Sequence, residues 1–364
     1  MIHIEKNKIP EELKSSEIYV YGGGFTGRTV IKLFQEYGLV ISAVIDDDEG
    51  LQGEKLFGIS VISFEKFCEI YILKKNISVV LTCIYGKAIL KKLNIFPKLN
   101  IYELFDWYNE IIGYNRWLEQ MSKKQELLVL KQEWEQLKEK WADRESINVL
   151  DGIWNYLNTK NLDDIVDICT EQEQYFIPEV LEAIKYPLYI IDGGAYRGEL
   201  LHSMLHNKLQ LKKWYCFEPD SENYCLLKKQ AQRNHLNEEQ ICVKKGLWSE
   251  NGRLYFESGN DTTSRIVPYE TSNYVEVVSI DEFIGMEKCN FIKMDIEGSE
   301  LAALRGGINI IKRERPILAI SIYHSIKDYW EIPKFLMQEL EKYKYYVRHH
   351  ALICNETVLY AIPE

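Results

Sequence analysis

The stretch IIDGGAYRG at residues 190–198 reads as a buried strand that ends in an acid and turns into a helix through glycines. Glycine at 194 and 198 lets the backbone approach a ligand closely, and the start of the next helix offers free amide donors to a carboxylate. Asp192 would repel a pyrophosphate but suits an ammonium group. The pattern therefore favours S-adenosylmethionine over a dinucleotide, with a purely structural turn as the alternative. The residues expected to bind this cofactor are Asp192, Gly193, Gly194, Ala195 and Gly198.

Apolar runs alternate with helical or loop segments throughout the C-terminal half of the chain. This alternation predicts an α/β fold with a parallel sheet. A polar turn at Asn355 and Glu356 separates two further runs, which predicts a hairpin that closes the sheet with an antiparallel edge strand. Such a strand is more typical of S-adenosylmethionine enzymes than of dinucleotide dehydrogenases. The runs are 188–191, 214–217, 241–248, 291–294 and 317–323, followed by 345–348 and 357–362 in the hairpin.

The second and third runs of this half supply further candidates for cofactor binding. Glu218 ends the second run and is followed by Pro219. A carboxylate at that position can accept hydrogen bonds from both ribose hydroxyls, as an acid after the glycine turn does in dinucleotide enzymes. Gly246 and Trp248 end the third run, where we expect an apolar wall for adenine. Trp248 is equally compatible with a place in the core.

Acidic and imidazole side chains follow the two later runs. Asp295 and Glu297 lie just beyond the run at 291–294, and His324 follows the run at 317–323. Ligands of open α/β sheets bind at the carboxyl ends of the strands, so these residues should face the same crevice. His324 is the candidate catalytic base and Asp295 the candidate group that orients it or the substrate. No metal is expected, although Asp295, Glu297 and His324 are an alternative ligand set for a divalent ion.

Four separated segments resemble the FkbM family of methyltransferases. They are IDGGAYRGEL at 191–200, FEP at 217–219, FIKMDIEGSEL at 291–301 and PILAISIYH at 316–324. The resemblance covers about residues 175–363 and implies a class I methyltransferase fold, with a Rossmann-like, mostly parallel sheet. It also implies O-methylation, often of sugar hydroxyls in polysaccharide or natural-product assembly. The family motifs place cofactor binding on Asp192, Gly194, Gly198, Glu218 and Asp295, whereas Tyr196 and Arg197 replace the smaller or amide residues of many members.

A second glycine motif lies near the start of the chain. YGGGFTG at 21–27 satisfies G-x-G-x-x-G between a predicted strand at 18–21 and a predicted helix at 28–37. Asp46 ends the next apolar run, so Gly22, Gly24, Gly27 and Asp46 form a candidate second nucleotide site. Residues 18–67 are similar to the Rossmann-like domain of sugar acyltransferases and related sugar-modifying proteins, which implies a nucleotide-sugar ligand. NAD binding and a purely structural domain are the alternatives.

These patterns divide the chain into three parts: a smaller Rossmann-like domain at 1–103, a helical connecting region at 104–186 and the methyltransferase domain at 187–364. In the middle part, apolar residues recur at spacings of three and four, which predicts an amphipathic helix. The pattern is too short for a sustained coiled coil, so we expect the helix to pack on a neighbouring domain, with a homodimer as the alternative. The residues of this face are Leu127, Leu130, Trp134, Leu137 and Trp141.

Composition excludes several classes of partner. The 364 residues carry a formal net charge of −11, which opposes binding to nucleic acid. Local basic pairs, Lys212 with Lys213 and Arg313 with Arg315, are expected to be ordinary surface charge. No run is long enough to span a bilayer, and residues 1–10 lack the apolar core of a secretory signal, so we expect a cytoplasmic protein. The eight cysteines form no C-x-x-C pair and are expected to be reduced thiols.

The predicted reaction is methyl transfer to a hydroxyl of a small-molecule or glycan acceptor. The acceptor oxygen attacks the sulfonium methyl group in line, while a base removes the hydroxyl proton. The segment 259–265 is a candidate substrate loop because its hydroxyl and amide side chains suit sugar hydroxyls. The alternative function is a nucleotide-sugar or NAD-dependent sugar-modifying enzyme that uses the N-terminal glycine motif.

Overall fold

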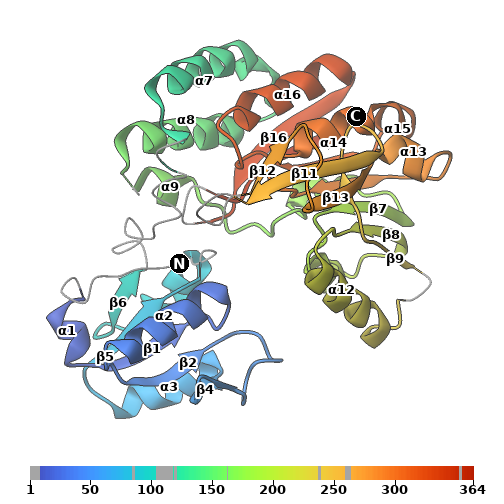
Figure 1. Ribbon diagram of the computed structural model, residues 1–364. Helices are drawn as coiled ribbons and strands as arrows, with labels where there is room; N and C mark the ends of the chain where they lie inside the picture. Colours follow the sequence, from blue (N-terminus) through green and yellow to red (C-terminus); the bar gives the residue numbers. More distant parts are fainter. Residues whose placement is uncertain are drawn as a thin grey trace. The chain divides into compact units, whose positions relative to one another are not determined.

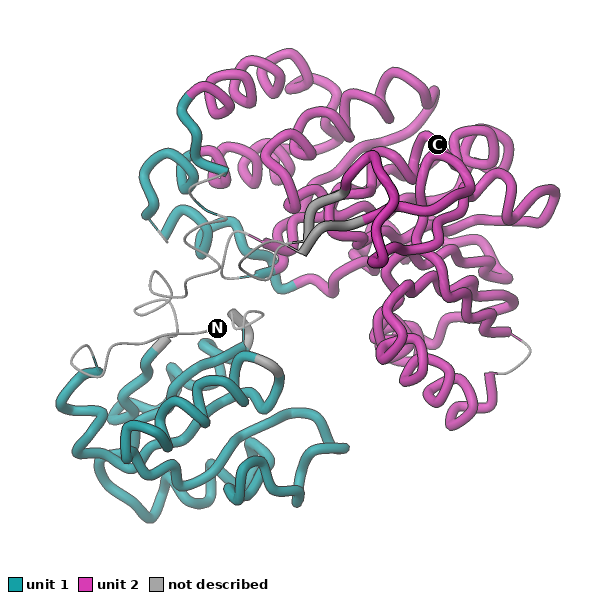
Figure 2. The backbone as a smooth tube through the Cα atoms, in the orientation of Figure 1, with its two compact units in different colours: residues 1–124, 155–171, 351–354 teal, residues 125–154, 172–350, 355–364 magenta. Residues whose placement is uncertain are grey.

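The computed structural model describes residues 9–83, 87–103, 118, 121–161, 163–236, 239–258, 264–351 and 355–364. The chain forms two compact units (Figure 2). The N-terminal unit comprises residues 1–124, 155–171 and 351–354, and the C-terminal unit comprises 125–154, 172–350 and 355–364. The region 104–186 is thus shared between the units, and the three-part division at residues 103 and 186 stays a prediction.

The N-terminal unit contains a six-stranded sheet of order β3-β4-β2-β1-β5-β6. Its strands are β1 (Glu17–Tyr21), β2 (Ile41–Ile45), β3 (Lys55–Leu56), β4 (Ile59–Ile62), β5 (Ile77–Leu81) and β6 (Asn100–Glu103). The short strand β3 pairs antiparallel with β4, and all other neighbours are parallel. This mostly parallel sheet is consistent with the smaller Rossmann-like domain that the alternating apolar runs predict.

Helices cover both faces of this sheet because the side chains of β1 alternate between the two faces. Ile18 and Val20 pack with α1 and α2, whereas Tyr19 and Tyr21 pack with α3 and α4 on the opposite side. The four helices are α1 (Glu11–Lys14), α2 (Phe25–Glu36), α3 (Phe64–Leu73) and α4 (Lys87–Leu93). Two cores result, one on each face of the sheet.

The C-terminal unit is built on a seven-stranded sheet of order β16-β17-β15-β14-β7-β8-β9. Its strands are β7 (Leu188–Gly193), β8 (Leu211–Phe217), β9 (Gln240–Val243), β14 (Phe291–Met294), β15 (Ile317–Ser321), β16 (Tyr343–His349) and β17 (Thr357–Pro363). The predicted hairpin consists of β16 and β17. β17 pairs antiparallel with both β15 and β16, so it lies one strand in from the edge and β16 is the edge strand. This order is consistent with the class I methyltransferase fold.

Helices cover this sheet as well, and its core is strongly aromatic. Trp214 and Phe291 are fully buried in it, and the Phe176 ring stacks on the Phe291 ring at 5.4 Å. Figure 1 shows α13, α14 and α15 grouped at one end and α12 beside β8 and β9. The helices are α10 (Pro178–Ala183), α11 (Leu200–His206), α12 (Ser221–Arg233), α13 (Ile280–Ile284), α14 (Glu300–Gly306), α15 (Ile308–Glu314) and α16 (Asp328–Glu339).

The third apolar run, 241–248, does not form a single strand. β9 ends at Val243, and the chain turns at the charged residues Lys244 and Lys245, which interrupt the apolar pattern. Gly246 and Leu247 then enter a separate four-stranded sheet of order β10-β13-β11-β12. Its strands are β10 (Gly246–Leu247), β11 (Gly252–Ser258), β12 (Ser264–Val267) and β13 (Tyr274–Val278). Residues 259–263 of the candidate substrate loop lie outside the described residues.

The amphipathic helix predicted for the middle of the chain is α7 (Lys124–Leu137), which leads through a 3-10 turn (Lys138–Lys140) to α8 (Arg144–Thr159) and α9 (Asp163–Ile168). The apolar face of α7 is buried. Trp134 Nε1 donates a hydrogen bond of 3.0 Å to the Tyr329 carbonyl, and Lys334 of α16 forms an ion pair of 2.7 Å with Glu133. α7 therefore lies against α16 in the C-terminal unit (Figure 1).

A buried arginine attaches the start of α8 to the large sheet. The side chain of Arg348 in β16 is only 1% exposed. Its guanidinium lies 2.6 Å from an Asp143 carboxylate oxygen and 2.8 Å from a Glu179 carboxylate oxygen. Ser146 Oγ also accepts a hydrogen bond from the Val347 amide at 2.9 Å. Because a buried guanidinium is stable only when its charge is paired, these contacts fix where α8 begins.

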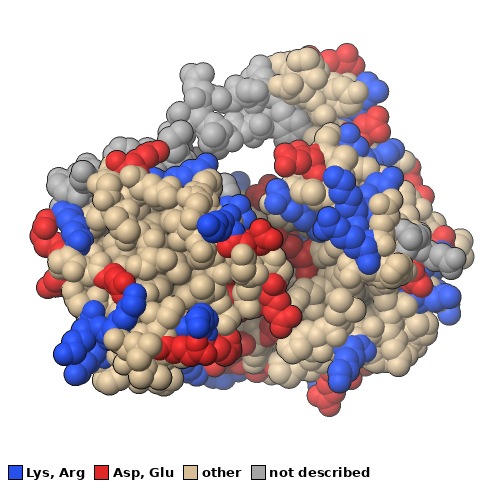
Figure 3. Space-filling model, turned by 90° about the horizontal axis from the view of Figure 1, so that it is seen from below, with Lys and Arg blue, Asp and Glu red and all other residues tan. Residues whose placement is uncertain are grey.

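The surface carries both signs of charge, with the densest group of basic side chains in the view of Figure 3 on the C-terminal unit. Three of the four basic residues singled out in the sequence contact other groups of the protein. Lys213 forms an ion pair of 2.6 Å with Glu287. Arg313 and Arg315 donate hydrogen bonds to backbone carbonyls. No helix within the described part of the chain combines the length and apolarity that crossing a bilayer requires.

Replacing Arg348 with methionine should weaken the C-terminal unit. We expect the free energy of unfolding to fall by about 2 to 4 kcal/mol, because removal of one partner from a buried ion pair leaves uncompensated acids. Urea unfolding followed by tryptophan fluorescence measures this change, since six of the eight tryptophans lie in the C-terminal unit. Lys138→Met is the matched control: its 3.4 Å pair with Glu135 is exposed and should contribute about 0.5 kcal/mol or less. Equal losses in the two variants would contradict the proposed attachment.

Candidate active site

The predicted site residues of the C-terminal unit follow adjacent strands at one edge of the sheet. β7 pairs in parallel with β8 on one side and with β14 on the other. The register places Asp192 beside Lys293 and Gly193 beside Met294 and Phe217. Strand order reverses between β7 and β14, which is where ligands bind in open α/β sheets.

The glycine turn after β7 is held close to both neighbouring strands. Gly194 has a φ of +70°, and a Cβ there would lie 1.9 Å from the Asp295 carbonyl oxygen, so no larger residue fits without a backbone shift. The amides of Gly194 and Ala195 both donate hydrogen bonds of 3.0 Å to the Phe217 carbonyl. The turn is therefore fixed in place by the backbones of β8 and of the segment after β14.

Asp192 is fully buried and its carboxylate points into the protein. One oxygen lies 3.1 Å from Lys293 Nζ and the other accepts a hydrogen bond of 3.1 Å from Trp214 Nε1. Burial raises the pKa of the Asp192 carboxyl, and the Lys293 ammonium opposes that rise. Lys293 also donates a hydrogen bond of 2.7 Å to the Gly194 carbonyl. Asp192 thus acts on the glycine turn through Lys293.

Glu218 follows β8 and keeps acceptor capacity on both carboxylate oxygens. One oxygen accepts a hydrogen bond of 2.9 Å from the Tyr196 amide, and the other accepts one of 2.8 Å from the Asp220 amide. Burial raises the pKa of Glu218, although these two amides oppose the shift. A carboxylate oxygen has two lone pairs, so each oxygen can accept one more hydrogen bond. Pro219 follows directly, and Asp220 caps α12 by accepting a hydrogen bond of 2.9 Å from the Asn223 amide.

Apolar side chains lie next to the glycine turn. A Cβ added to Gly193 would lie 2.9 Å from a Leu247 methyl group and 3.3 Å from an Ile296 methyl group. Gly246 precedes Leu247 in β10, and the partly buried Trp248 donates its amide to the Val278 carbonyl at 3.0 Å. The apolar surface beside the turn thus includes Leu247, which lies in the run expected to form the adenine wall, and Ile296, which was not singled out in the sequence.

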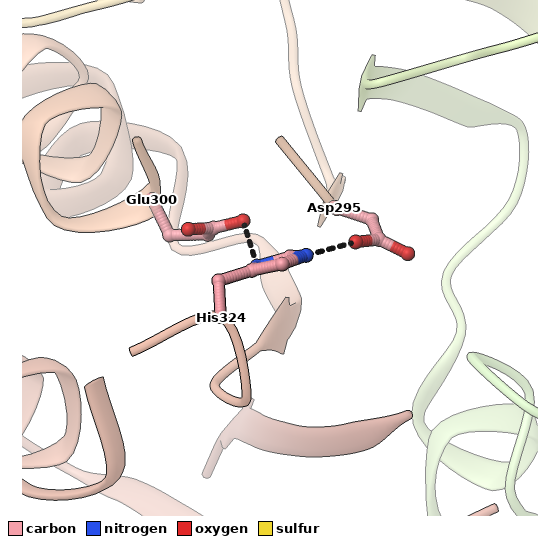
Figure 4. Close-up of side chains that lie close together, drawn as sticks. All are labelled: Asp295, Glu300 and His324. Atoms are coloured by element: carbon pink, nitrogen blue, oxygen red, sulfur yellow. Dashed lines mark ion pairs between the residues drawn. The ribbon is translucent and has the colours of Figure 1, made fainter. Parts of the chain in front are cut away.

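His324 lies between two carboxylates from different elements (Figure 4). Its Nδ1 is 3.0 Å from an oxygen of Glu300, the first residue of α14, and its Nε2 is 3.2 Å from an oxygen of Asp295. The Glu300 side chain is fully buried and the His324 side chain is 9% exposed. Burial alone would lower the histidine pKa, but Asp295 and Glu300 raise it well above its usual value of 6.5. The two carboxylates thus favour the imidazolium form of the ring, which has no lone pair with which to accept a proton.

Asp295 is the most heavily contacted of the predicted catalytic residues. Besides His324, it accepts hydrogen bonds of 3.0 Å from the Tyr175 hydroxyl and 3.2 Å from the Tyr323 hydroxyl. Burial works against ionisation, but His324, Lys293 and Tyr175 outweigh it and lower the pKa of Asp295 to about 2. Asp295 is therefore a fixed negative charge and a weak base.

The same residues also meet the distance criterion for a metal site. Ligand atoms of Asp295, Glu300 and His324 all lie within 4.8 Å of one another. However, one ring nitrogen faces Glu300 and the other faces Asp295, whereas one ion binds one nitrogen of a histidine. Glu297, the third ligand suggested by the sequence, is 93% exposed and 3.7 Å from the ring. The arrangement is that of a chain of ion pairs.

Glu356 joins this cluster from the segment that enters β17. Its carboxylate accepts a hydrogen bond of 2.8 Å from the Gln174 side-chain amide and one of 3.4 Å from the Tyr323 hydroxyl. Burial and the nearby charge of Asp295 raise the pKa of Glu356 to about 7. The sequence showed only a polar turn at this position.

Residues that sequence reasoning missed complete the site. Lys293 and Glu300 lie inside the segment FIKMDIEGSEL, and Tyr323 precedes His324, so their motifs were found but not their roles. Tyr175 and Glu356 lie outside the quoted motifs, far along the chain from the residues that they contact. Only the fold brings them to this edge of the sheet.

In the N-terminal unit, the acid Asp46 hydrogen-bonds to the glycine turn. Asp46 accepts a hydrogen bond of 2.6 Å from the Gly23 amide and one of 2.8 Å from the Asp48 amide. A Cβ on Gly27 would lie 1.8 Å from the Gly22 carbonyl oxygen, so this glycine allows α2 to approach β1. A Cβ on Gly24 would meet no atom within 4 Å. The turn thus has an open side at Gly24, where α2 begins.

Comparison with known proteins identifies the C-terminal half. Residues 192–347 match the family model described as the Methyltransferase FkbM domain. This segment is an FkbM methyltransferase domain. It contains β8 to β15 and the four motifs, the first of them without its initial isoleucine. It also contains both residues of the Asp295–His324 contact. No curated protein is significantly similar to the chain in sequence.

One solved structure shares the fold of the chain. The crystal structure of methyltransferase FkbM from Methylobacillus flagellatus KT is 21% identical, with a TM-score of 0.57, and the match covers 98% of this chain and 92% of that one. At this identity the likeness shows the fold, and it extends over both units. An rRNA methylase from Streptococcus thermophilus is 14% identical, with a TM-score of 0.34, over 50% of this chain and 92% of that one.

The family match assigns S-adenosylmethionine-dependent methyl transfer to the domain at residues 192–347. The chemistry of the donor set fits that cofactor. Glu218 has one free acceptor position on each oxygen, which matches the two hydroxyls of a ribose. The apolar side chains of Leu247 and Ile296 beside the glycine turn suit an adenine or a methionine side chain.

The protonation of His324 can be measured directly. We expect both ring nitrogens to carry protons at about pH 8, well above the ordinary histidine pKa, because a carboxylate faces each of them. Nitrogen-15 NMR of the imidazole groups reports this state, and His324→Gln assigns the signal by its absence. The stabilisation from the raised pKa is complete below the ordinary value of 6.5 and is lost as the pH rises through the raised value. A neutral ring at about pH 8 would rule out the double ion pair.

Proposed function

We propose that the protein is an O-methyltransferase that acts on a sugar hydroxyl in a glycan, a nucleotide sugar or a natural product. The observation that carries this proposal is the cluster beyond β14 and β15, in which carboxylates, phenols and an amide converge next to the glycine turn. Such groups hydrogen-bond hydroxyls well. Polysaccharide biosynthesis is the process that fits such an acceptor.

Binding of S-adenosylmethionine is assigned to the strand ends of β7 and β8. Glu218 would hold the ribose, and the backbone of Gly193, Gly194, Ala195 and Gly198 would surround the methionine end, with Asp192 acting through Lys293. When bound, the cofactor supplies a methyl group that the sulfonium activates for transfer. Gly246 and Trp248 stay assigned to the adenine side, together with Leu247.

Asp295 and His324 are assigned to the acceptor side. Asp295 carries a fixed negative charge that can orient a hydroxyl by accepting its hydrogen bond. His324 would serve as a base only after losing the proton that Asp295 and Glu300 stabilise. Its ion pairs instead favour a positioning role, since they fix Asp295 relative to α14. No metal is needed for these roles.

The N-terminal domain is proposed to bind a nucleotide sugar at Gly22, Gly24, Gly27 and Asp46. The open side of the turn at Gly24 and the start of α2 favour an anionic group there. The same site is the basis of the alternative function, a nucleotide-sugar or NAD-dependent enzyme. Because Asp46 already binds the Gly23 amide, ribose recognition by this acid would use its remaining lone pairs.

A cytoplasmic location and the state of association belong to the same proposal. All cysteines of the described segments are free thiols, as is usual in a reducing compartment. The face of α7 that the sequence offers for a homodimer is buried within the C-terminal unit, so it gives a dimer no support.

Glu218→Ala should weaken cofactor binding without unfolding the protein. We expect the dissociation constant for S-adenosylhomocysteine to rise about 10- to 100-fold, in line with about 1.5 to 3 kcal/mol for hydrogen bonds to a charged group. Calorimetric titration measures this change. Glu222→Ala, an exposed glutamate in the first turn of α12, is the matched control and should bind normally. Unchanged affinity in Glu218→Ala would remove this residue from the cofactor site.

Gly24→Val tests the N-terminal site. A Cβ added at Gly24 meets no protein atom within 4 Å, so we expect the fold to persist while the open side of the turn is blocked. We expect UDP-glucose binding to weaken about tenfold or more, which equals about 1.4 kcal/mol, while S-adenosylhomocysteine affinity is unchanged. Gly252→Val, at another open glycine, is the control. Binding of NADH instead of UDP-glucose by the wild type would favour the alternative function, and binding of neither would leave a structural domain.

A further inference from the structure

Glu356 lies at the end of the large sheet in an uncommon backbone conformation. It precedes β17, the strand inserted between β15 and β16, and so lies beside the end of β15. Its backbone has a φ of +59°, a conformation that residues with a side chain rarely adopt. The His350 amide donates a hydrogen bond of 3.0 Å to its carbonyl and helps to hold this conformation. Strain of this kind is common at functional sites.

The Glu356 side chain is only partly buried, and two hydrogen bonds orient it. Gln174 donates to one carboxylate oxygen at 2.8 Å and Tyr323 lies 3.4 Å from the other. Each oxygen therefore retains a lone pair for a further donor. The Tyr323 hydroxyl also lies 3.2 Å from Asp295, so one phenol connects the two acids.

Three side chains beyond the ends of β14 and β15 are of types that can act as bases, and their surroundings decide which of them can accept a proton. His324 is already protonated because it lies between Asp295 and Glu300. Asp295 is stabilised as an anion by His324, Tyr175 and Tyr323 and holds a proton weakly. Glu356 receives no ion pair among the described residues, and the negative charge of Asp295 disfavours its ionised form. Its carboxylate is thus the strongest available base of the three.

We propose that the Glu356 carboxylate is the general base that removes the proton from the acceptor hydroxyl, an inference that rests on the proposed O-methyl transfer. As the acceptor O–H bond breaks, its proton goes to a Glu356 oxygen. The acceptor oxygen forms a bond to the methyl carbon, and the carbon–sulfur bond breaks with its electron pair going to sulfur. The products are the methyl ether, S-adenosylhomocysteine and a neutral Glu356 carboxyl, which releases its proton to water.

The groups around Glu356 determine how it titrates. From β14 and the segment after it, Lys293 favours the anion and Asp295 opposes it, and from the end of β15, His324 favours the anion. Gln174 donates to the anion, and Tyr323 can donate to it or accept from the neutral carboxyl. Burial and Asp295 outweigh the rest, so the pKa of Glu356 is about 7. A base with that pKa is ionised in part at neutral pH and still binds a proton well.

The test compares Glu356→Gln, which keeps the size and the hydrogen bonds, with Glu356→Asp, which keeps the acid. Glu341→Gln, at an exposed site just before β16, is the matched control. Titration with S-adenosylhomocysteine should give unchanged affinity in all three variants. Carbon-13 NMR of the glutamate carboxyls in that complex should show one signal that titrates near pH 7 and is absent from Glu356→Gln. A complex without such a signal would overturn the proposal, whatever the acceptor.

Activity is measured with radiolabelled S-adenosylmethionine and a panel of methyl glycosides and UDP-sugars. The wild-type kcat/KM should rise with pH through about 7, as Glu356 ionises. In Glu356→Gln, kcat should fall about 100- to 10,000-fold and kcat/KM should no longer rise with pH. Glu356→Asp should keep part of the kcat and part of the pH dependence. Methylation with an unchanged kcat in Glu356→Gln would overturn the base and leave the O-methyltransferase intact. A wild type that methylates no member of the panel would instead count against the sugar acceptor, and the NMR titration would still test Glu356.

Discussion

The ion pair between Asp192 and Lys293 is the interaction on which the site of this methyltransferase depends. Both side chains are buried at facing positions of β7 and β14, at the point where strand order reverses. Neither charge is tolerable alone in such a place, but together they are, because Lys293 also donates to the Gly193 and Gly194 carbonyls. The pair therefore holds the glycine turn against the sheet. It also gives a reason for the acid of the first motif, Asp192, and for the lysine of the third, Lys293.

From this pair the site extends in two directions. Toward β8, the Tyr196 amide of the turn donates a hydrogen bond to Glu218 and orients the carboxylate that is proposed to hold the cofactor. Toward β15, the close approach of Gly194 to the Asp295 carbonyl fixes where the side chain of Asp295 begins. Asp295, His324 and Glu300 then form a chain in which the histidine lies between two carboxylates. These contacts hold Asp295 and His324 in place and disfavour proton transfer to either of them. The cofactor side and the acceptor side are thus built outward from one buried contact.

The sequence predicted the parts of this arrangement that are local. Strands, glycine turns and strand-end acids show themselves in short patterns, so both sheets and the positions of Asp192, Glu218, Asp295 and His324 could be read directly. The contacts of Asp192 could not be predicted, since Trp214 and Lys293 reach it only across paired strands. The protonation of His324 depends on Glu300, which the first turn of α14 places next to the ring nitrogen Nδ1. The run at 241–248 looked continuous because period-two patterns do not reveal where a chain leaves one sheet for another.

The central place of β17 has a consequence for how the protein is made. Because residues 357–363 insert between two strands that precede them in the chain, β15 keeps an open edge during synthesis and β16 has no partner in the large sheet until they emerge. Nascent chains would therefore expose a template for mispairing until residues 357–363 emerge. With the proposed assignment, the strand ends on the cofactor side would be complete before the acceptor side, so a newly made chain would gain its ability to bind before its ability to react.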